Sequence, residues 1–303
     1  MKNRSLGSSL LIVAFSLTSI AATAASQCPT FTYKDVTVNV SGALETDSYA
    51  INDSGVIAGD YIDSTGVQHG MLMKGSQVKT IDNPDCAAST LTFYGVNSTG
   101  VAAGQCYLNS TGLLAALVWN QGKFTTLVPP DSTTANASGI NDNGDVVGSY
   151  TDSSGQQHGF VYSNGKYVKL DPPSDAGLTV GAWSINNQGY VTIYTESSAP
   201  QYLSYVTPDL GKTYIPFAYS GAGSLGTVIH GINNKNGIDG TYYDANSGTH
   251  GIAYYKGEFC TLDDPNSTNA TRADGINDSF EMVGRYTDST SGATVGYSVV
   301  PNK

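Results

Sequence analysis

Six residues with side chains suited to binding or chemistry occupy the same place in a sequence repeat. The dipeptide Ile-Asn or Val-Asn occurs six times in register, and the residue two positions before its Ile or Val varies among five types. These residues are Tyr49, Tyr94, Ser138, Trp183, His230 and Asp274. The constant positions build the frame, so the variable ones are free to specialise. Our candidate ligand-binding residues are Tyr49, Tyr94, Trp183, His230 and Asp274.

This set favours a carbohydrate ligand, because aromatic faces stack on sugar rings and fixed polar groups bond the hydroxyls. The alternative is that the same side chains pack between sheets as core filler, as most large aromatic residues do. The preferred function is therefore a binding module for a glycan or for a surface partner.

A catalytic interpretation uses part of the same set. His230 or a Tyr would act as the base, Arg272 would neutralise a carboxylate and Asp274 would orient a partner, as a polysaccharide lyase or hydrolase requires. No nucleophile elbow, HExxH, phosphate-binding loop, CxxC pair or dinucleotide fingerprint stands in a credible context. Only catalysis requires these three side chains to converge within hydrogen-bond reach around an open pocket.

Three further histidines, His69, His158 and His250, lie at equivalent places in the first, third and fifth repeats. They form either a metal-binding or pH-sensitive set, or a frame in which each is bonded to neighbouring backbone or Tyr. We favour the frame, because equivalent residues of different repeats lie too far apart to share an ion. Turns such as Asn141–Asp145 resemble calcium loops but lack the later bidentate Glu, so we interpret them as hairpin turns. We expect no metal site and no cofactor, with structural calcium as the alternative.

The repeat itself predicts the fold. Successive Asn residues of the dipeptide are 45, 44, 45, 47 and 44 positions apart. In the third copy, Asp145–Thr151, Gln157–Tyr162 and Lys166–Leu170 have the composition of strands and are separated by Asp, Asn and Gly turns. With the segment before Ile140, each unit holds four strands, which is typical of one blade of a β-propeller. The sequence predicts an all-β, six-bladed β-propeller over residues 25–303, with repeats starting near residues 47, 92, 136, 181, 228 and 272.

The chain ends predict how the ring closes. The last repeat stops at residues 297–300, before its outermost strand, whereas Phe31–Val38 forms an extra strand near the start of the mature chain. We expect this N-terminal strand to complete the last blade, because closure removes exposed sheet edges. A linear solenoid is the alternative, but it would need polar capping repeats at its ends.

The repeat resembles the HAF-repeat family of bacterial extracellular proteins. The resemblance lies in the pattern GIN-x-x-G-x-VVG-x-Y and in segments such as His158-Gly159-Phe160, and it extends over nearly all of the mature chain. It implies an extracellular, β-propeller-like protein, and it brings no activity and no catalytic residues with it. The second, fourth and sixth repeats lack the His.

The fourth repeat departs most from the pattern. Ile193 replaces the Gly that stands seven residues after Asn in the other five copies, and Glu196–Pro200 forms its second turn. Either this repeat has drifted or it forms one wall of a site, and the presence of Trp183 favours a site.

The N-terminus and the charge predict location and partners. Residues 1–24 have a basic start, a short apolar run and a small-x-small cleavage pattern, which together indicate a signal peptide. We therefore expect a secreted or periplasmic monomer without a membrane span. The net charge of −11 argues against nucleic acid and anionic membranes as partners.

Four cysteines follow the signal peptide, and four cysteines allow three disulfide pairings. Placed on the propeller, the pairs Cys86–Cys106 and Cys28–Cys260 would each join neighbouring blades, so we favour this pairing. The 20-residue loop between Cys86 and Cys106 predicts a stabilisation of about 3 kcal/mol.

Overall fold

The computed structural model describes residues 28–35, 42–172, 178–197 and 201–302. The predicted signal peptide over residues 1–24 lies outside these ranges. The described residues form strands joined by turns, and no helix among them has the length and apolar character needed to cross a membrane.

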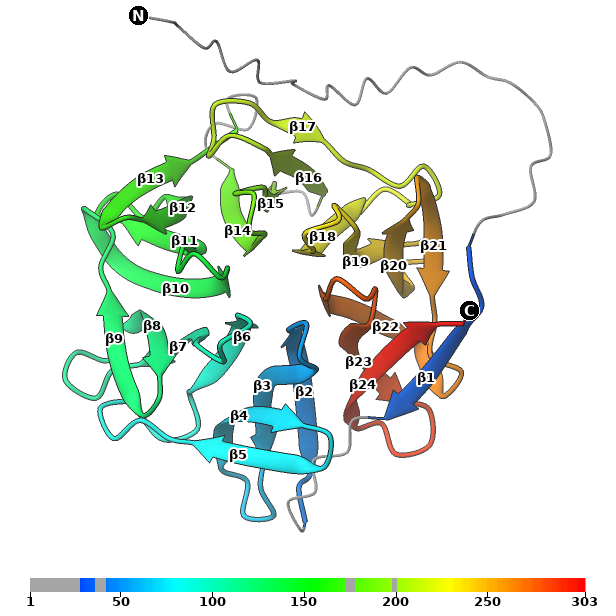
Figure 1. The fold of residues 1–303 in the computed structure, drawn as a ribbon, viewed down its shortest axis with the longest axis horizontal. Coiled ribbons are helices and arrows are strands. Elements are labelled where there is room, and N and C mark those ends of the chain that lie inside the picture. The colour runs from blue at the N-terminus through cyan, green and yellow to red at the C-terminus, as the bar shows by residue number, and fades with distance from the viewer. Residues whose placement is uncertain (1–27, 36–41, 173–177, 198–200, 303) are drawn as a thin grey trace, which may run out of the picture.

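Four antiparallel sheets of four strands follow one another along the chain. They are β2 (Glu45–Ile51), β3 (Val56–Ile62), β4 (Gln68–Lys74) and β5 (Gln77–Ile81); β6 (Thr92–Val96), β7 (Ala102–Tyr107), β8 (Leu114–Asn120) and β9 (Lys123–Leu127); β10 (Ser132–Ile140), β11 (Val146–Asp152), β12 (Gln157–Ser163) and β13 (Lys166–Leu170); and β14 (Thr179–Ile185), β15 (Val191–Glu196), β16 (Tyr202–Thr207) and β17 (Ile215–Pro216). Figure 1 shows the sheets arranged around a central axis, with β2, β6, β10 and β14 innermost.

The remaining strands form an eight-stranded sheet made of two four-stranded halves. The halves are β18 (Thr227–Ile232), β19 (Ile238–Tyr243), β20 (Thr249–Tyr255) and β21 (Glu258–Leu262); and β22 (Ser267–Ile276), β23 (Met282–Asp288), β24 (Thr294–Pro301) and β1 (Phe31–Asp35). The only strand pairing between the halves in the described part of the chain is one parallel bridge, between Thr249 and Ala270. Each half therefore repeats the four-strand unit of the earlier sheets.

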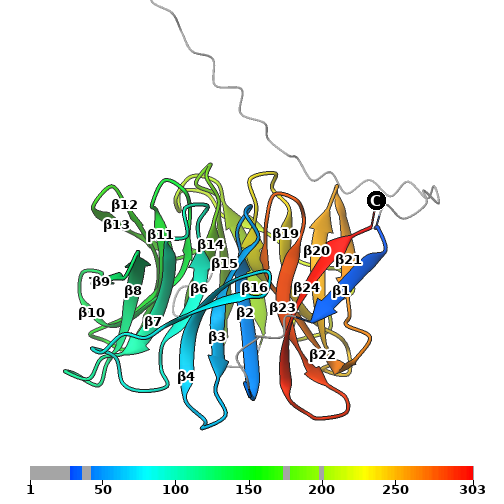
Figure 2. The same ribbon diagram turned by 60° about the horizontal axis from the view of Figure 1, so that its bottom comes forward.

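The N-terminal strand pairs where the sequence predicts. β1 runs antiparallel to β24, with Tyr33 opposite Val299 and Phe31 opposite Pro301. Figure 2 shows the two strands side by side at the edge of the molecule. The predicted strand Phe31–Val38 is described only as far as Asp35.

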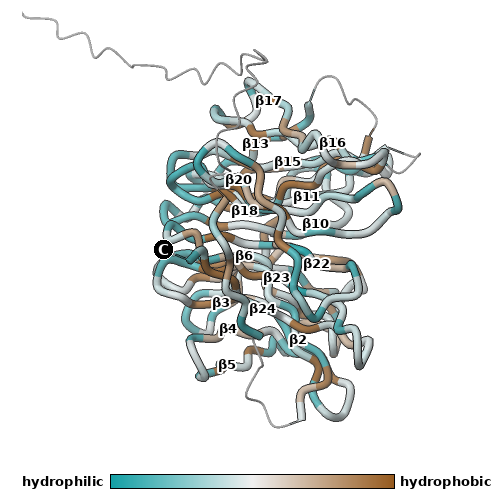
Figure 3. Tube along the Cα trace, turned by 90° about the vertical axis from the view of Figure 1, so that its right-hand side faces the viewer, coloured by the Kyte–Doolittle hydropathy of each residue, from teal (hydrophilic) through white to brown (hydrophobic). Residues whose placement is uncertain are grey.

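Apolar side chains fill the space between neighbouring sheets. One such cluster joins Phe93 and Trp119 to Leu72, between the first two sheets, and another joins Ile51 and Met73 to Val283 of β23. The first sheet thus packs on the sixth unit as well as on the second. Figure 3 shows hydrophobic stretches along the strands and hydrophilic turns at the surface.

Small residues allow the innermost strands to meet closely at the axis. A methyl group added at Gly275 would lie 2.7 Å from the Cα atom of Ala50, and one added at Gly139 would lie 2.7 Å from the carbonyl oxygen of Trp183. No larger side chain fits at these positions without moving the backbone. The glycines therefore let the innermost strands lie close together around the central space, which we call the axial channel.

Both predicted disulfides are present. Cys28 is bonded to Cys260 on β21, and Cys86 is bonded to Cys106 on β7. The first ties the segment before β1 to the neighbouring unit, and the second ties the connection after β5 to the second sheet.

Candidate functional site

The six variable residues identified in the sequence share one local structure. In every innermost strand the pairing register shifts at this place, so that the strand carries an extra residue. Tyr49, Tyr94, Ser138, Trp183 and Asp274 are the residues left out of the pairing, and His230 is left out together with Gly231. A β-bulge breaks the alternation of side chains along a strand and can re-aim one of them.

Four of these side chains contact one another around the axis. The ring centroids of Tyr49 and Tyr94 are 4.7 Å apart, those of Tyr94 and Trp183 are 6.1 Å apart, and those of Trp183 and His230 are 4.5 Å apart. The guanidinium of Arg285 lies 4.8 Å from the ring centre of Tyr49. The rings partly fill the channel and leave only some of their surface at its mouth.

His230, the fourth of these side chains, is buried, with 3% of its surface exposed. Its Nδ1 lies 2.7 Å from the carbonyl oxygen of Ala273 and 3.2 Å from Oδ1 of Asp274. Burial lowers the pKa of His230, although the carboxylate of Asp274 opposes that effect. The imidazole is therefore neutral and donates its Nδ1 proton inside the protein.

Asp274 pairs with Arg285 and not with Arg272. Nη1 of Arg285 lies 3.1 Å from Oδ2 of Asp274, and its Nε lies 3.6 Å from Oδ1 of Asp47. Within the described ranges Arg272 takes part in no ion pair. Two residues separated by one position normally share a face of a strand, but the bulge at Asp274 breaks that relation.

Arg285 was missed because it lies on the second strand of its unit, eight residues after the repeat Asn. The equivalent residues are Asp60, Gln105, Ser149, Tyr194, Thr241 and Arg285. This position varies as much as the one two residues before the Ile or Val of the dipeptide, so variation along the second strand is the sequence signal that points to Arg285.

Asp60 adds an unusual carboxyl group near Arg285. It is 5% exposed and stands opposite Asp47 in the β2–β3 ladder. Burial and the charge of Asp47 raise the pKa of Asp60 to about 7. This carboxyl is thus partly protonated at neutral pH.

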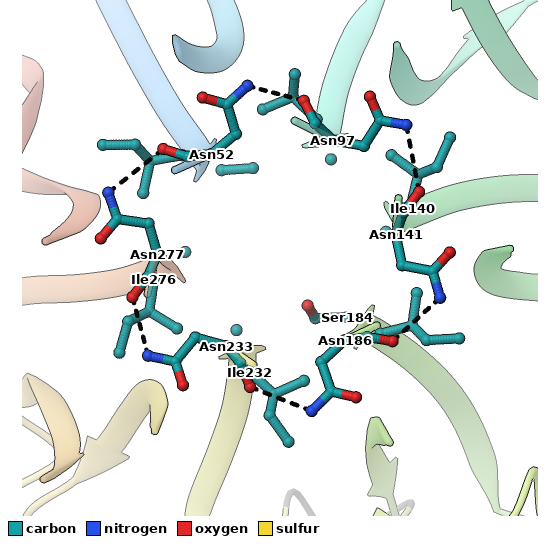
Figure 4. A pocket seen from close by; sticks show the side chains of 18 of the residues that line it. Asn52, Asn97, Ile140, Asn141, Ser184, Asn186, Ile232, Asn233, Ile276 and Asn277 are labelled. Atoms are coloured by element: carbon teal, nitrogen blue, oxygen red, sulfur yellow. Dashed lines mark hydrogen bonds between the residues drawn. The ribbon is translucent and has the colours of Figure 1, made fainter. Parts of the chain in front are cut away.

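A ring of asparagine side chains surrounds one mouth of the channel (Figure 4). Each repeat Asn donates from its Nδ2 to the backbone carbonyl of the next repeat Asn, over distances of 2.7 to 3.3 Å. The ring runs through Asn52, Asn97, Asn141, Asn186, Asn233 and Asn277 and returns to Asn52. We call this ring the asparagine collar.

The side-chain oxygen of each collar Asn accepts hydrogen bonds from backbone N–H groups of its own turn. Oδ1 of Asn141 accepts hydrogen bonds from the backbone N–H groups of Asn143 and Asp145, at 3.0 and 2.9 Å. Gly144 in this turn has φ of +81°, which glycine adopts without steric cost. Asp would supply the acceptor but no donor, which explains why all six copies have Asn.

The residues that follow the collar form an acidic rim. Asp142, Asn187, Asn234, Asp278 and Asp53 each accept a hydrogen bond at Oδ1 from the equivalent backbone N–H of the preceding unit, at 2.7 to 2.9 Å. Three of these five side chains are carboxylates, so the rim repels acidic ligands.

A cavity of about 90 Å³ lies inside the collar. Tyr49, Tyr94, Trp183 and Asp274 line it together with residues of the collar and the rim. Gly231 lines it, but the neighbouring His230 does not. The structure thus brings three predicted aromatic residues and Asp274 to one cavity. His230 contacts Trp183 and Asp274 from a buried position without lining the cavity, and Arg272 does not line it either.

The three repeat histidines each lie between two carboxylates. In the third sheet, Nδ1 of His158 lies 2.8 Å from Asp171 and Nε2 lies 3.1 Å from Asp152, while the ring of Tyr150 is 5.2 Å away. His69 and His250 repeat this arrangement. The histidines are frame residues as favoured, but their hydrogen-bond partners are Asp side chains, and Tyr contributes a ring contact. Among the described residues, no group of three or more His, Cys, Asp or Glu side chains is placed to hold a metal ion.

Comparisons with known proteins show the propeller fold. No protein-family model matches the sequence, and no curated protein matches it. A fungal lectin from Aleuria aurantia, described as a six-bladed β-propeller with a novel mode of fucose recognition, has a TM-score of 0.50 and 14% identity over 84% of this chain and 94% of its own. A mutant of this lectin in complex with Fucα1-6GlcNAc gives the same score and identity over 84% and 96%. Trypanosoma rangeli sialidase gives a TM-score of 0.52 at 10% identity, over 89% of this chain and 59% of its own.

Proposed function

We propose that this chain is a secreted, monomeric, six-bladed β-propeller of HAF-type repeats that binds a glycan at the mouth of its axial channel, without catalysis. In this proposal β1 completes the sixth blade and closes the ring. The return of the asparagine collar to Asn52 and the packing of Val283 on Ile51 support closure. The two disulfides support an oxidising compartment.

The composition of the axial cavity carries the proposal. Tyr49, Tyr94 and Trp183 line this cavity together with amide and carboxylate side chains of the collar and the rim. Aromatic carbon receives the C–H surface of a sugar, and the polar groups bond its hydroxyls. The volume of about 90 Å³ admits one edge of a terminal sugar residue rather than a buried oligosaccharide.

The catalytic alternative has less support. A general base must reach the proton that it removes, and His230 is 3% exposed with its Nδ1 bonded to Ala273. Asp274 is engaged by Arg285. Acidic polysaccharides, which a lyase would cleave, also meet an acidic rim. Sialidase has a related fold, but a fold by itself carries no activity.

A glycan array tests the proposal. The mature chain should retain neutral glycans, and Trp183→Phe should weaken the retained ligand about 10-fold, which is 1.4 kcal/mol. Trp183→Phe keeps most of the packing on His230, so the fold should survive, and a melting curve checks it. Tyr107→Ala is the control, because Tyr107 is an aromatic residue 48% exposed and outside the cavity. Binding of no glycan, or release of unsaturated or hydrolysed product, would refute the proposal.

A further inference from the structure

The fourth sheet lacks a full outer strand. Its β17 has two residues, whereas β5, β9, β13 and β21 have five each. The chain from Phe217 to Gly226 then leads to β18 without forming a strand. A recess of about 270 Å³ lies between this segment and β16.

Aromatic side chains that are fixed by the neighbouring sheet form the walls of this recess. The ring of Tyr202 stacks on that of Tyr243 on β19, with centroids 5.5 Å apart and planes 19° apart. Tyr219 meets Tyr242 edge to face at 4.8 Å. These contacts fix the positions of the two rings.

Hydrogen bonds fix the backbone of the recess as well. Oγ of Ser204 donates to the carbonyl of Thr227 at 2.8 Å and accepts from the N–H of Ile229 at 3.1 Å. The N–H of Tyr219 donates to Oγ1 of Thr227 at 3.1 Å. A wall built in this way is preorganised, so little ordering cost is left for binding.

The lining of the recess is uncharged. No Asp, Glu, Lys, Arg or His is among its lining residues, although the protein as a whole carries a net charge of −11. Gln201 and Ser224 add exposed polar side chains, and Tyr202 and Tyr219 are partly exposed phenols. Burial raises the pKa of Tyr202 to about 12, with contributions from Tyr243 and from Glu196, which is also hydrogen-bonded to the Tyr202 hydroxyl.

This combination defines the ligand class. An uncharged wall disfavours a phosphate, a carboxylate or an ammonium group, since none would find a counter-charge there. Aromatic faces with hydroxyl and amide groups suit a molecule that has one apolar face and several hydroxyls. The volume lies just below the 300–1,000 Å³ that is typical of pockets for drug-sized ligands, which fits one sugar residue.

We infer that this recess is a second carbohydrate site, which holds one neutral sugar residue between β16 and the segment from Phe217 to Gly226. It rests on the proposed function for its ligand class. It is a separate site, because no residue that lines the recess also lines the axial cavity. The fourth repeat then forms the wall of a site, in agreement with its departure from the repeat pattern.

The experiment blocks the recess without touching its packed rings. Ser224 is an exposed residue of the lining, so Ser224→Trp should fill the recess and weaken binding of a neutral monosaccharide about 10-fold or more. Ser153→Trp is the matched control, because Ser153 is an exposed turn residue of the third sheet. The probes are L-fucose, D-galactose, D-glucose and D-mannose, followed by saturation-transfer NMR and calorimetry on the mature chain. Thermal melting confirms that both variants are folded.

The outcomes separate the two sites. If Ser224→Trp loses monosaccharide binding while Trp183→Phe and Ser153→Trp retain it, the recess is the monosaccharide site. Equal binding by Ser224→Trp and the wild type overturns the inference, and so does a lack of binding of all four sugars. If array binding then depends on Trp183 alone, the proposed function stands without the recess.

Discussion

The side-chain amide of Asn277 donates a hydrogen bond to the backbone carbonyl of Asn52, 3.3 Å away and 225 positions earlier in the chain. Oδ1 of the same Asn277 accepts from the N–H groups of Ser279 and Glu281 at 2.9 and 3.0 Å. One buried side chain therefore shapes the last repeat's turn and joins the last repeat to the first.

Asn277→Asp should destabilise the protein by about 1–3 kcal/mol, because it replaces the buried donor to Asn52 with a carboxylate oxygen that faces the Asn52 carbonyl. That carbonyl then keeps only its hydrogen bond from the N–H of Gly55. Urea unfolding at pH 7 measures the loss. Asn246→Asp is the control, since Asn246 is exposed in the turn before β20. Equal midpoints for the two variants would show that the contact contributes nothing.

Asp60 should make stability fall as the pH rises. Burial raises its pKa from 3.8 to about 7, so the native state keeps a proton that the unfolded chain releases above about pH 4. Stability is therefore lost between about pH 4 and pH 7. Asp47, Arg285, Thr92 and Gln68 are the groups that face it.

The test is Asp60→Asn, which keeps the shape and removes the titration. This variant should be more stable than the wild type at pH 8, by an amount on the order of 1–4 kcal/mol, and similar to it at pH 4. Chemical denaturation at both pH values measures the difference. A constant difference across the range would mean that the carboxyl does not titrate there.

The His69 cluster predicts a second pH dependence. Burial alone would lower the pKa of His69, but hydrogen bonds to Asp82 and Asp63 outweigh it and raise the pKa above 6.5. The backbone N–H of Val67 and the hydroxyl of Thr65 hold the pKa of Asp63 low. The contribution of His69 to stability is thus complete below pH 6.5 and is lost as the pH rises through its native pKa. The contribution of Asp63 is present above pH 4 and is lost in strong acid.

His69→Gln should flatten the stability profile above pH 6.5 while it leaves the acid limb in place. An NMR titration of the imidazole in the wild type gives the pKa directly. A value at or below 6.5 would show that desolvation outweighs the two carboxylates.

Loss of the Cys86–Cys106 disulfide should lower the free energy of unfolding by about 3 kcal/mol, because this disulfide closes a loop over a sequence separation of 20. The double variant Cys86→Ser/Cys106→Ser should unfold at a lower denaturant concentration with an intact Cys28–Cys260 bond, which mass spectrometry under non-reducing conditions confirms. An unchanged denaturation midpoint would show that this disulfide does not stabilise the fold.

The frame of the molecule is readable from the sequence because it is repeated. Turn glycines such as Gly144, the strand Lys166–Leu170 and the pairing of the segment around Tyr33 with the last strand follow from local rules applied to each copy. The disulfides follow from the same layout, since it brings each cysteine next to its partner.

The site was only partly predictable. Variation at one position located Tyr49 and Trp183, but the bulges that aim them depend on pairing between strands and have no signal in a single strand. The partnership of Asp274 with Arg285 depends on the same irregularity. The only sign of the recess beside β16 in the repeat spacing is the longest interval, 47 residues, which does not predict the shape of the recess.

The six bulges give the axis an unusual tolerance to change. A residue that stands outside the ladder can be replaced by Tyr, Ser, Trp, His or Asp, and these are the residues found there, while the hydrogen-bonded neighbours on either side keep their partners. The side chains that face the channel can thus be substituted one unit at a time while the strand pairing is kept. The same six bulge positions are available for protein engineering.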